Sequence, residues 1–99
     1  MRLEVSEYAT LQLEEIWSFH AVEAGVKVAD KITGKILSDI DRLVARPRAA
    51  QVETLLDHLG MEHRRLVSGH YKIIYRIIDD LIFVSDIFDS RQDPERMAW

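Results

Sequence analysis

The chain has 99 residues, of which 47% are hydrophobic and 30% charged, and its formal net charge is -4. This length allows one small domain with a modest core, so we expect a single domain over residues 1–99. The chain has no cysteine, which excludes disulfides, thiolate metal sites and a cysteine nucleophile. No segment approaches the ~18 apolar residues of a membrane span, and Glu4 stands where a signal peptide needs an apolar block. We therefore expect a cytoplasmic protein without a membrane partner. Its acidic charge argues against general attraction to nucleic acid but permits a local basic patch.

The first half of the chain predicts a strand followed by two helices. Residues 3–5 alternate with polar neighbours as a short strand does, and Ser6 is a good N-cap for a helix that ends near Gly25. Residues 26–45 carry an apolar stripe at helical spacing, and Pro47 terminates that helix. With almost no linker between them, the two helices should form an antiparallel hairpin.

Two features of these helices carry separate expectations. Gly34 costs stability inside the second helix, which a close approach of the two helices would explain. Trp17, Phe19 and His20 on the first helix fit the core and its edge. An exposed Trp17 or Phe19 would instead indicate a surface for dimer formation or target binding.

The second half changes to the two-residue period of strands. Residues 48–62 fit either a short amphipathic turn or two, or a partly ordered loop. Strands are predicted at 63–67, 70–78 and 81–88, joined by tight turns at Ser68-Gly69 and Asp79-Asp80. Residues 93–97 resemble a cap and a final helical turn. The order predicts an α+β fold in which an N-terminal strand, a helix hairpin and a three-stranded antiparallel meander form one sheet.

The meander carries a cluster of basic residues. If Ser68-Gly69 is a two-residue turn, Arg65 faces Lys72 on one side of the sheet. Arg76 lies further along the same face and His63 lies nearby. Facing like charges repel one another, so such a patch is expected to meet an anion such as phosphate, a carboxylate-rich peptide or an acidic protein surface.

Simpler alternatives apply to several polar residues. Exposed cations on a sheet usually face solvent or pair with nearby acids. His58 and His63, beside Asp57 and Glu62, lack the spacing of a metal site, so no metal is expected. Ser68 next to a glycine is better explained as a turn residue than as a nucleophile.

The order of motifs in the second half is specific. It contains Arg64-Arg65-Leu66, Gly69, Tyr71-Lys72-Ile73-Ile74-Tyr75-Arg76, Asp79-Asp80, and a last strand that runs through Arg91 to Pro94. In this order and spacing, the chain resembles the RelE/ParE family of bacterial toxins. The resemblance covers the whole chain in layout and roughly residues 62–95 in motif.

The resemblance implies a toxin that a cognate antitoxin neutralises, in a toxin–antitoxin hetero-oligomer and without a cofactor. RelE-like members cleave messenger RNA in the ribosomal A site, whereas ParE-like members inhibit DNA gyrase. The fold alone does not separate these activities.

The resemblance also assigns candidate roles to the basic residues. Arg65 and Lys72 match positions at which RelE-like nucleases carry basic catalytic residues, and Arg91 matches the arginine of the closing motif. His63 falls where another basic residue would lie and could carry a proton. Such an enzyme is a metal-independent endoribonuclease in which cations stabilise the scissile phosphate. In the binding interpretation, the contact residues are Arg64, Arg65, Lys72, Arg76 and Arg91.

Departures from the nuclease pattern favour the ParE-like alternative. Residues 53–57 contain no lysine, the tail contains no tyrosine, and Asp86 and Asp89 replace the basic residues of many members. We therefore expect a gyrase inhibitor without enzymatic activity, with the nuclease or a non-toxic antitoxin-binding relative as alternatives. Arg65, Lys72 and Arg91 in one open concavity would favour the nuclease, and their pairing with acids would count against it.

Overall fold

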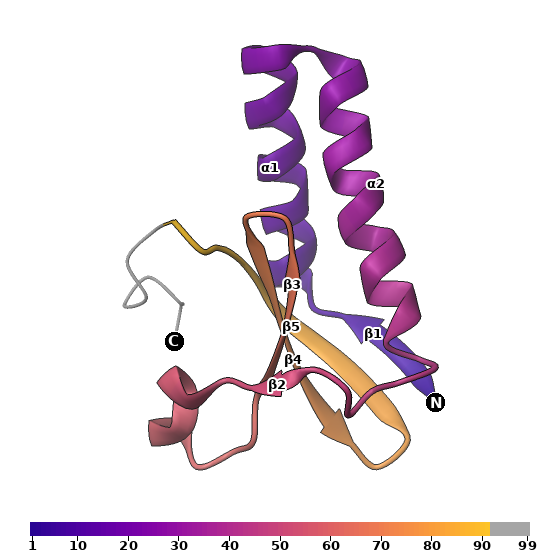
Figure 1. Ribbon diagram of the computed structural model, residues 1–99, viewed down its shortest axis with the longest axis vertical. Helices are drawn as coiled ribbons and strands as arrows, with labels where there is room; N and C mark the ends of the chain where they lie inside the picture. Colours follow the sequence, from indigo (N-terminus) through magenta and orange to yellow (C-terminus); the bar gives the residue numbers. More distant parts are fainter. Residues whose placement is uncertain (92–99) are drawn as a thin grey trace.

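The structure is a computed structural model that describes residues 1–91 (Figure 1). The predicted cap and helical turn at 93–97 lie outside the described residues. The elements in chain order are β1 (Arg2–Val5), α1 (Glu7–Ala24), α2 (Val26–Arg42), β2 (Gln51–Val52), the 3-10 helix η1 (Thr54–Leu59), β3 (Arg64–Ser68), β4 (Tyr71–Ile78) and β5 (Leu81–Asp89). This order confirms the predicted α+β fold. Neither helix of the described part is long and apolar enough to cross a membrane.

One mixed sheet of five strands forms the centre of the molecule, in the order β1-β5-β4-β3-β2. The antiparallel meander of β3, β4 and β5 is confirmed. β1 lies parallel to β5, with Arg2 opposite Leu81 and Val5 opposite Val84. β2 adds a two-residue antiparallel edge to β3.

The helix hairpin forms as the sequence predicts, with clear start and stop signals. The Ser6 hydroxyl accepts a hydrogen bond from the Ala9 amide at 3.0 Å, which caps α1. Gly25, with φ +95°, ends α1 and leads directly into α2. α2 ends at Arg42, earlier than the predicted residue 45. The amides of the next residues bond three residues back, and this tightens the last turn out of α-geometry.

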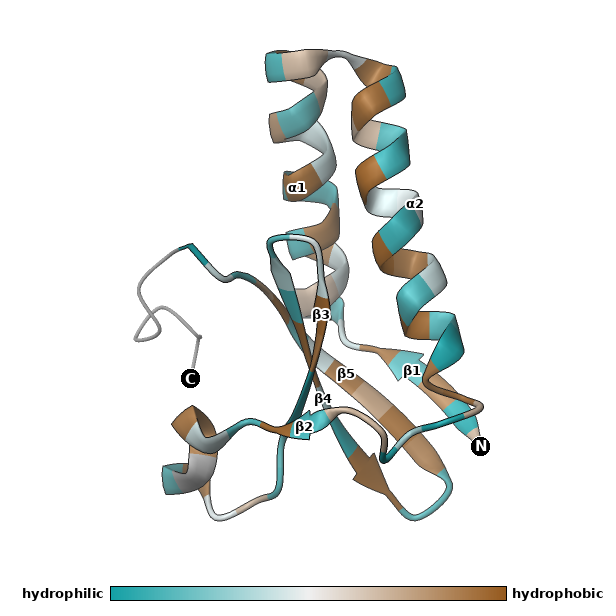
Figure 2. Cartoon of the chain, in the orientation of Figure 1, coloured by the Kyte–Doolittle hydropathy of each residue, from teal (hydrophilic) through white to brown (hydrophobic). Residues whose placement is uncertain are grey.

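The core lies between the helix hairpin and one face of the sheet. Figure 2 shows hydrophobic residues concentrated along β4 and β5. Ile36 and Ile40 of α2 pack with Tyr75, Ile82 and Val84 of the sheet, all fully or almost fully buried. A smaller cluster on the opposite face joins Leu56 of η1 to Ile74 and Phe88. The ambiguous segment 48–62 therefore forms a short strand and an amphipathic turn that covers this second face.

The turn between β3 and β4 differs from the prediction. It consists of Gly69 and His70, so Ser68 pairs with Tyr71. Gly69 has φ +59° and occupies the first central position of a two-residue turn, where glycine is preferred. The predicted turn at Ser68-Gly69 was therefore wrong by one position.

This turn also corrects the predicted pairing of the basic residues. Arg65 lies opposite Ile74 rather than Lys72, and Lys72 lies opposite Val67. Each residue pairs two positions further along β4, and a shift of two keeps every side chain on its predicted face. Arg65 and Lys72 thus share a face without facing each other directly.

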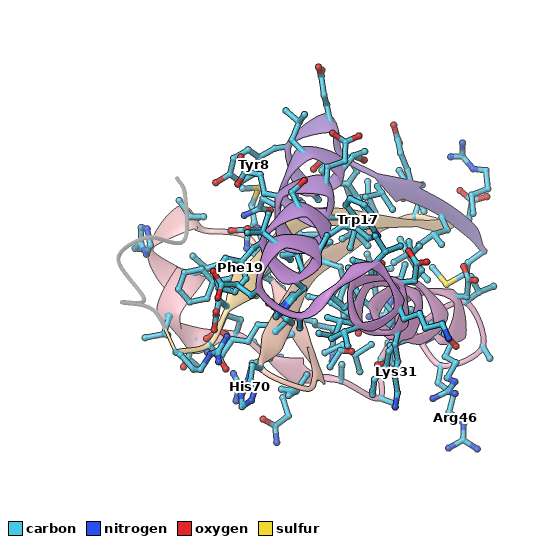
Figure 3. All side chains as sticks on the ribbon, turned by 90° about the horizontal axis from the view of Figure 1, so that it is seen from above. Tyr8, Trp17, Phe19, Lys31, Arg46 and His70 are labelled. Atoms are coloured by element: carbon cyan, nitrogen blue, oxygen red, sulfur yellow. The ribbon has the colours of Figure 1, made fainter. Side chains whose placement is uncertain are left out.

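Two expectations about the helices were wrong. Gly34 is exposed, and a Cβ placed on it would meet nothing within 4 Å, so no helix approaches it closely. Phe19 is 58% exposed rather than at the core edge. Figure 3 shows Phe19 on the side of α1 away from α2, whereas Trp17 points toward α2. Trp17 is half-buried there and donates a hydrogen bond to Asp30 at 2.8 Å.

Candidate functional site

The basic residues of the sheet surround a buried carboxylate. Glu53, only 1% exposed, follows β2 and lies 3.5 Å from the Arg65 guanidinium and 3.4 Å from the Lys72 ammonium. Its amide donates to the His63 carbonyl at 2.7 Å, and its Oε1 accepts from the Leu55 amide at 3.3 Å. The backbone thus fixes Glu53 between the two cations at the start of η1. We name Glu53, Arg65 and Lys72 the sheet-face cluster.

Arg64 is also occupied by the protein itself. Its guanidinium donates to the carbonyls of Arg48 and Ala50 at 3.2 and 2.9 Å, and it lies 3.6 Å from the Glu62 carboxylate. These bonds hold the segment that follows α2 against β3. Among the side chains that the structure describes, no carboxylate forms an ion pair with Arg76.

His63 lies in the interior rather than on an open surface. It is 2% exposed, and its Nδ1 lies 3.1 Å from the Met61 carbonyl. Burial lowers the pKa of His63, the Met61 carbonyl raises it, and the charge of Arg76 lowers it further. A buried neutral imidazole is poorly placed to exchange protons with a substrate.

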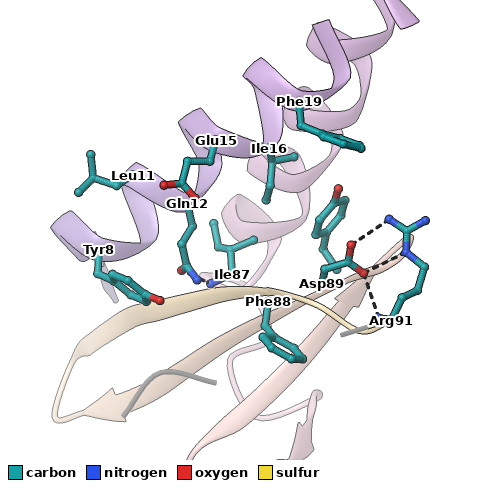
Figure 4. A pocket seen from close by; sticks show the side chains of 11 residues that line it. Tyr8, Leu11, Gln12, Glu15, Ile16, Phe19, Ile87, Phe88, Asp89 and Arg91 are labelled. Atoms are coloured by element: carbon teal, nitrogen blue, oxygen red, sulfur yellow. Dashed lines mark hydrogen bonds and ion pairs between the residues drawn. The ribbon is translucent and has the colours of Figure 1, made fainter. Parts of the chain in front are cut away.

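Arg91 lies on a different part of the molecule, beside α1. Its guanidinium donates to both carboxylate oxygens of Asp89, at 3.0 and 2.9 Å, and its amide donates to the same group at 2.9 Å. The hydrogen bond from Arg91 lowers the pKa of Asp89 against the opposing effect of burial. Figure 4 shows this pair at one end of an open groove.

We name this concavity the α1–β5 groove, after the elements that form it. Its volume is about 540 Å³. Its most exposed apolar side chains come from one helix: Tyr8 is 45% exposed, Leu11 50% and Phe19 58%. β1 pairs with β5 only as far as Val84, and beyond it the Gln12 side chain accepts from the Ile87 amide at 2.7 Å. The groove therefore lies where α1 replaces β1 along the edge of β5 (Figure 4).

Tyr71 lies in the wall between this groove and a smaller pocket. The smaller pocket has a volume of about 150 Å³ and lies between α2 and the β3–β4 turn. There the Tyr71 hydroxyl lies 2.8 Å from Nε2 of His20. Burial raises the pKa of Tyr71, Asp89 raises it further, and Arg91 lowers it. The hydroxyl is therefore neutral at physiological pH and acts as a hydrogen-bonding group.

The candidate catalytic residues do not line one cavity. Arg91 borders both the groove and the smaller pocket, whereas neither Arg65 nor Lys72 lines either one. In the described part of the chain, no three His, Asp or Glu side chains are grouped as metal ligands. The geometry provides an open apolar groove and, separately, an ionic cluster in which two cations share one buried carboxylate.

The sequence interpretation missed Glu53 and the groove. Glu53 gave little signal, because it lies among the apolar residues of an ambiguous segment. The sequence of α1 did contain a usable signal for the groove. The side of the helix away from its buried residues also carries apolar residues, namely Tyr8, Leu11, Phe19 and Val22. A helix that is apolar on both sides requires a second partner.

The structure is that of a small α+β protein with an open apolar groove, and comparison with known proteins supplies the family. A family model described as "ParE toxin of type II toxin-antitoxin system, parDE" matches residues 3–94. The chain belongs to this ParE toxin family. A solved structure described as "Chromosomal ParDE TA system from P. aeruginosa" is similar in fold, with a TM-score of 0.77 and 20% identity over 90% of this chain and 95% of that one. Comparison with curated proteins finds no match.

Proposed function

We propose that this ParE-family toxin inhibits DNA gyrase in the cytoplasm, and that a cognate ParD-type antitoxin neutralises it. Family membership supports the toxin role. The observation that carries the choice of gyrase over messenger RNA is the pairing of the candidate cations. Arg65 and Lys72 bind Glu53, and Arg91 binds Asp89.

Physical chemistry explains why this pairing argues against a nuclease. Metal-free cleavage of RNA requires cations that are aimed, before the substrate arrives, at the charge that develops on the phosphate. A guanidinium already bound to a carboxylate is weakened for that purpose, and two separate locations cannot act on one phosphate. A protein that inhibits by binding needs neither arrangement.

The basic contact residues remain part of this proposal. Arg64, Arg65, Lys72 and Arg91 already have partners within the protein. Arg76 has no carboxylate partner among the described side chains, so we expect it to contribute most to contact with an acidic surface of the target. Arg76→Glu should then reduce inhibition without changing antitoxin binding.

The α1–β5 groove is the surface we assign to the antitoxin. Tyr8, Leu11 and Phe19 offer apolar contacts along one helix, and Glu15 lines the same groove. α1 contains four glutamates and no lysine or arginine. These features fit an amphipathic helix or an added strand with apolar anchors and basic flanking residues.

The first test is a supercoiling and DNA-cleavage assay with purified gyrase, the protein, and the product of its neighbouring antitoxin gene. We expect loss of supercoiling or trapped cleaved DNA, reversed when antitoxin is added. Unchanged gyrase at high excess of toxin, together with cleavage of messenger RNA on programmed ribosomes, would replace this proposal with the nuclease. Inactivity in both assays with intact antitoxin binding would indicate the non-toxic relative.

A further inference from the structure

The two helices of the hairpin carry opposite charges. Residues 26–48 contain six of the thirteen Lys and Arg residues but only three of the seventeen Asp and Glu residues. The neighbouring α1 has four glutamates and neither lysine nor arginine. The acidic net charge of the chain therefore conceals a basic region on and after α2.

The basic residues of α2 lie on one face. At 3.6 residues per turn, Lys27, Lys31, Lys35 and Arg42 fall within an arc of roughly 80°, over a length of about 22 Å. The buried residues Ala29, Thr33, Ile36 and Ile40 of α2 lie on the opposite face, and buried Asp39 lies beside the basic residues. We name these four residues the basic ridge. Figure 3 shows Lys31 extending away from α1, and Arg46, just after the helix, extends from the same side of the molecule.

Most of this charge is available to a ligand. Lys27 and Lys31 are exposed, and neither forms an ion pair within residues 1–91. Lys35 and Arg42 share Asp39, at 2.8 and 3.3 Å, but their side chains are still 60% and 77% exposed.

Gly34 provides an independent observation. It lies beside the ridge on the exposed side of α2, where glycine is unfavourable and no neighbouring atom requires its small size. A glycine in such a position permits close approach of another molecule to the helix backbone. The ridge, with Gly34 and Ser38 between its members, contains no apolar side chain.

We propose that the basic ridge binds the phosphate backbone of double-stranded DNA. Protein partners usually require an apolar centre with a polar rim, which the ridge lacks. A polyanion requires only exposed cations at regular spacing, because release of its counterions supplies the affinity. This binding does not depend on gyrase, although it would hold the toxin on the DNA that gyrase acts on.

The test measures binding of the full-length protein to a fluorescent DNA duplex of about 20 base pairs, by anisotropy over a range of salt concentrations. Lys27→Gln/Lys31→Gln removes the two unpaired lysines and keeps the Asp39 pairs. The matched control, Thr10→Glu/Ser18→Glu, changes the net charge equally at exposed positions of α1. We expect the lysine variant to lose about tenfold in affinity and to show a shallower salt dependence, while the control loses less than about threefold.

Gly34→Gln separates a binding role from a structural one. It should raise the thermal midpoint, because glutamine is a better helix former. At the same time it should weaken DNA binding several-fold, because a side chain then stands within the ridge. A raised midpoint with unchanged binding would contradict the close approach that we infer.

Other outcomes would overturn the proposal. Equal losses in the lysine variant and its control would mean that only net charge matters. Tighter binding to single-stranded RNA, or equal binding to a polyglutamate peptide, would assign the ridge to another polyanion. Failure of the proposed function gives a different result: DNA binding that persists although gyrase is not inhibited would retain the ridge and reject gyrase as the target.

Discussion

The α1–β5 groove and the sheet-face cluster differ in which kind of side chain they bury. In the groove, apolar residues that suit a core are exposed, as Phe19 shows at 58%. In the sheet-face cluster, the charged Glu53 is 1% exposed and its two cations are turned toward it. One region leaves apolar surface exposed, and the other places one buried carboxylate against two cations.

This difference separates residues that stabilise the fold from residues that leave apolar surface open to a partner. Glu53, Arg65 and Lys72 hold β2 and η1 against the sheet, so they maintain the fold. Phe19 and Leu11 contribute little to the core of the isolated chain, so their apolar surface is free for a partner. Residue type alone would suggest the reverse assignment, with the cations as site and the aromatics as core.

The largest effect is expected in the sheet-face cluster. Arg65→Gln/Lys72→Gln leaves the buried Glu53 carboxylate without a cation, which should lower the free energy of unfolding by about 3 kcal/mol. Urea denaturation measures this loss. Adding Glu53→Gln to the same chain should recover most of it, because a neutral amide is easier to bury. A loss below about 1 kcal/mol in the double variant would mean that water already reaches Glu53.

In the groove, substitution should change binding rather than stability. Phe19→Glu should weaken antitoxin binding by roughly 30-fold, or about 2 kcal/mol, because it places a charge in an apolar contact. The free energy of unfolding should change by no more than about 0.5 kcal/mol. Calorimetric titration and urea denaturation test the two parts. Val67→Glu, at a 60% exposed position on β3, is the matched control and should bind normally.

The outer face of α2 serves as a reference, because at Gly34 neither burial nor ion pairing determines the effect of a substitution on stability. Gly34→Ala should raise the free energy of unfolding by about 1 kcal/mol through helix propensity alone. The extra methyl group meets nothing within 4 Å. Urea denaturation measures this change, and a lower free energy of unfolding would mean that Gly34 has a packing role that the structure does not show.

The smallest effect concerns pH and the buried His63. Burial lowers the pKa of the folded imidazole, whereas the unfolded one takes up a proton near pH 6.5. Stability is therefore complete above about pH 6.5 and falls as the pH drops toward the lower, folded pKa. His63→Asn should flatten the dependence of the urea midpoint on pH in this window. If the urea midpoint of the variant depends on pH as strongly as that of the wild type, the pH dependence arises from another histidine.

The sequence predicted the elements well because their signals are local. Ser6, Gly25 and Pro47 marked helix ends, and the two-residue period marked β3 to β5. It could not predict that β1 would lie parallel to β5, because that pairing joins residues about eighty positions apart and no local pattern encodes it. The predicted β3–β4 turn failed by one residue, since both Ser68-Gly69 and Gly69-His70 are acceptable turns.

The candidate site was less accessible to sequence analysis. Arg65 and Lys72 were correctly placed on one face, but both pair with Glu53, which comes from a segment without clear periodicity. Phe19 was misassigned because helical spacing identifies an apolar position without saying what covers it. Only the packing of α1 against β5 reveals which apolar positions stay open.

The position of β5 has a consequence for how the toxin folds during its synthesis. β5 lies at the centre of the contacts with β1, β4 and α1 and forms the floor of the groove. A nascent chain in which residues 81–91 have not yet been synthesised has neither the mixed sheet nor a groove, even if its helices have already formed. Contacts so distant in sequence form late and slowly. Residues 81–91 thus complete both the sheet that carries the basic residues and the groove that we assign to the antitoxin.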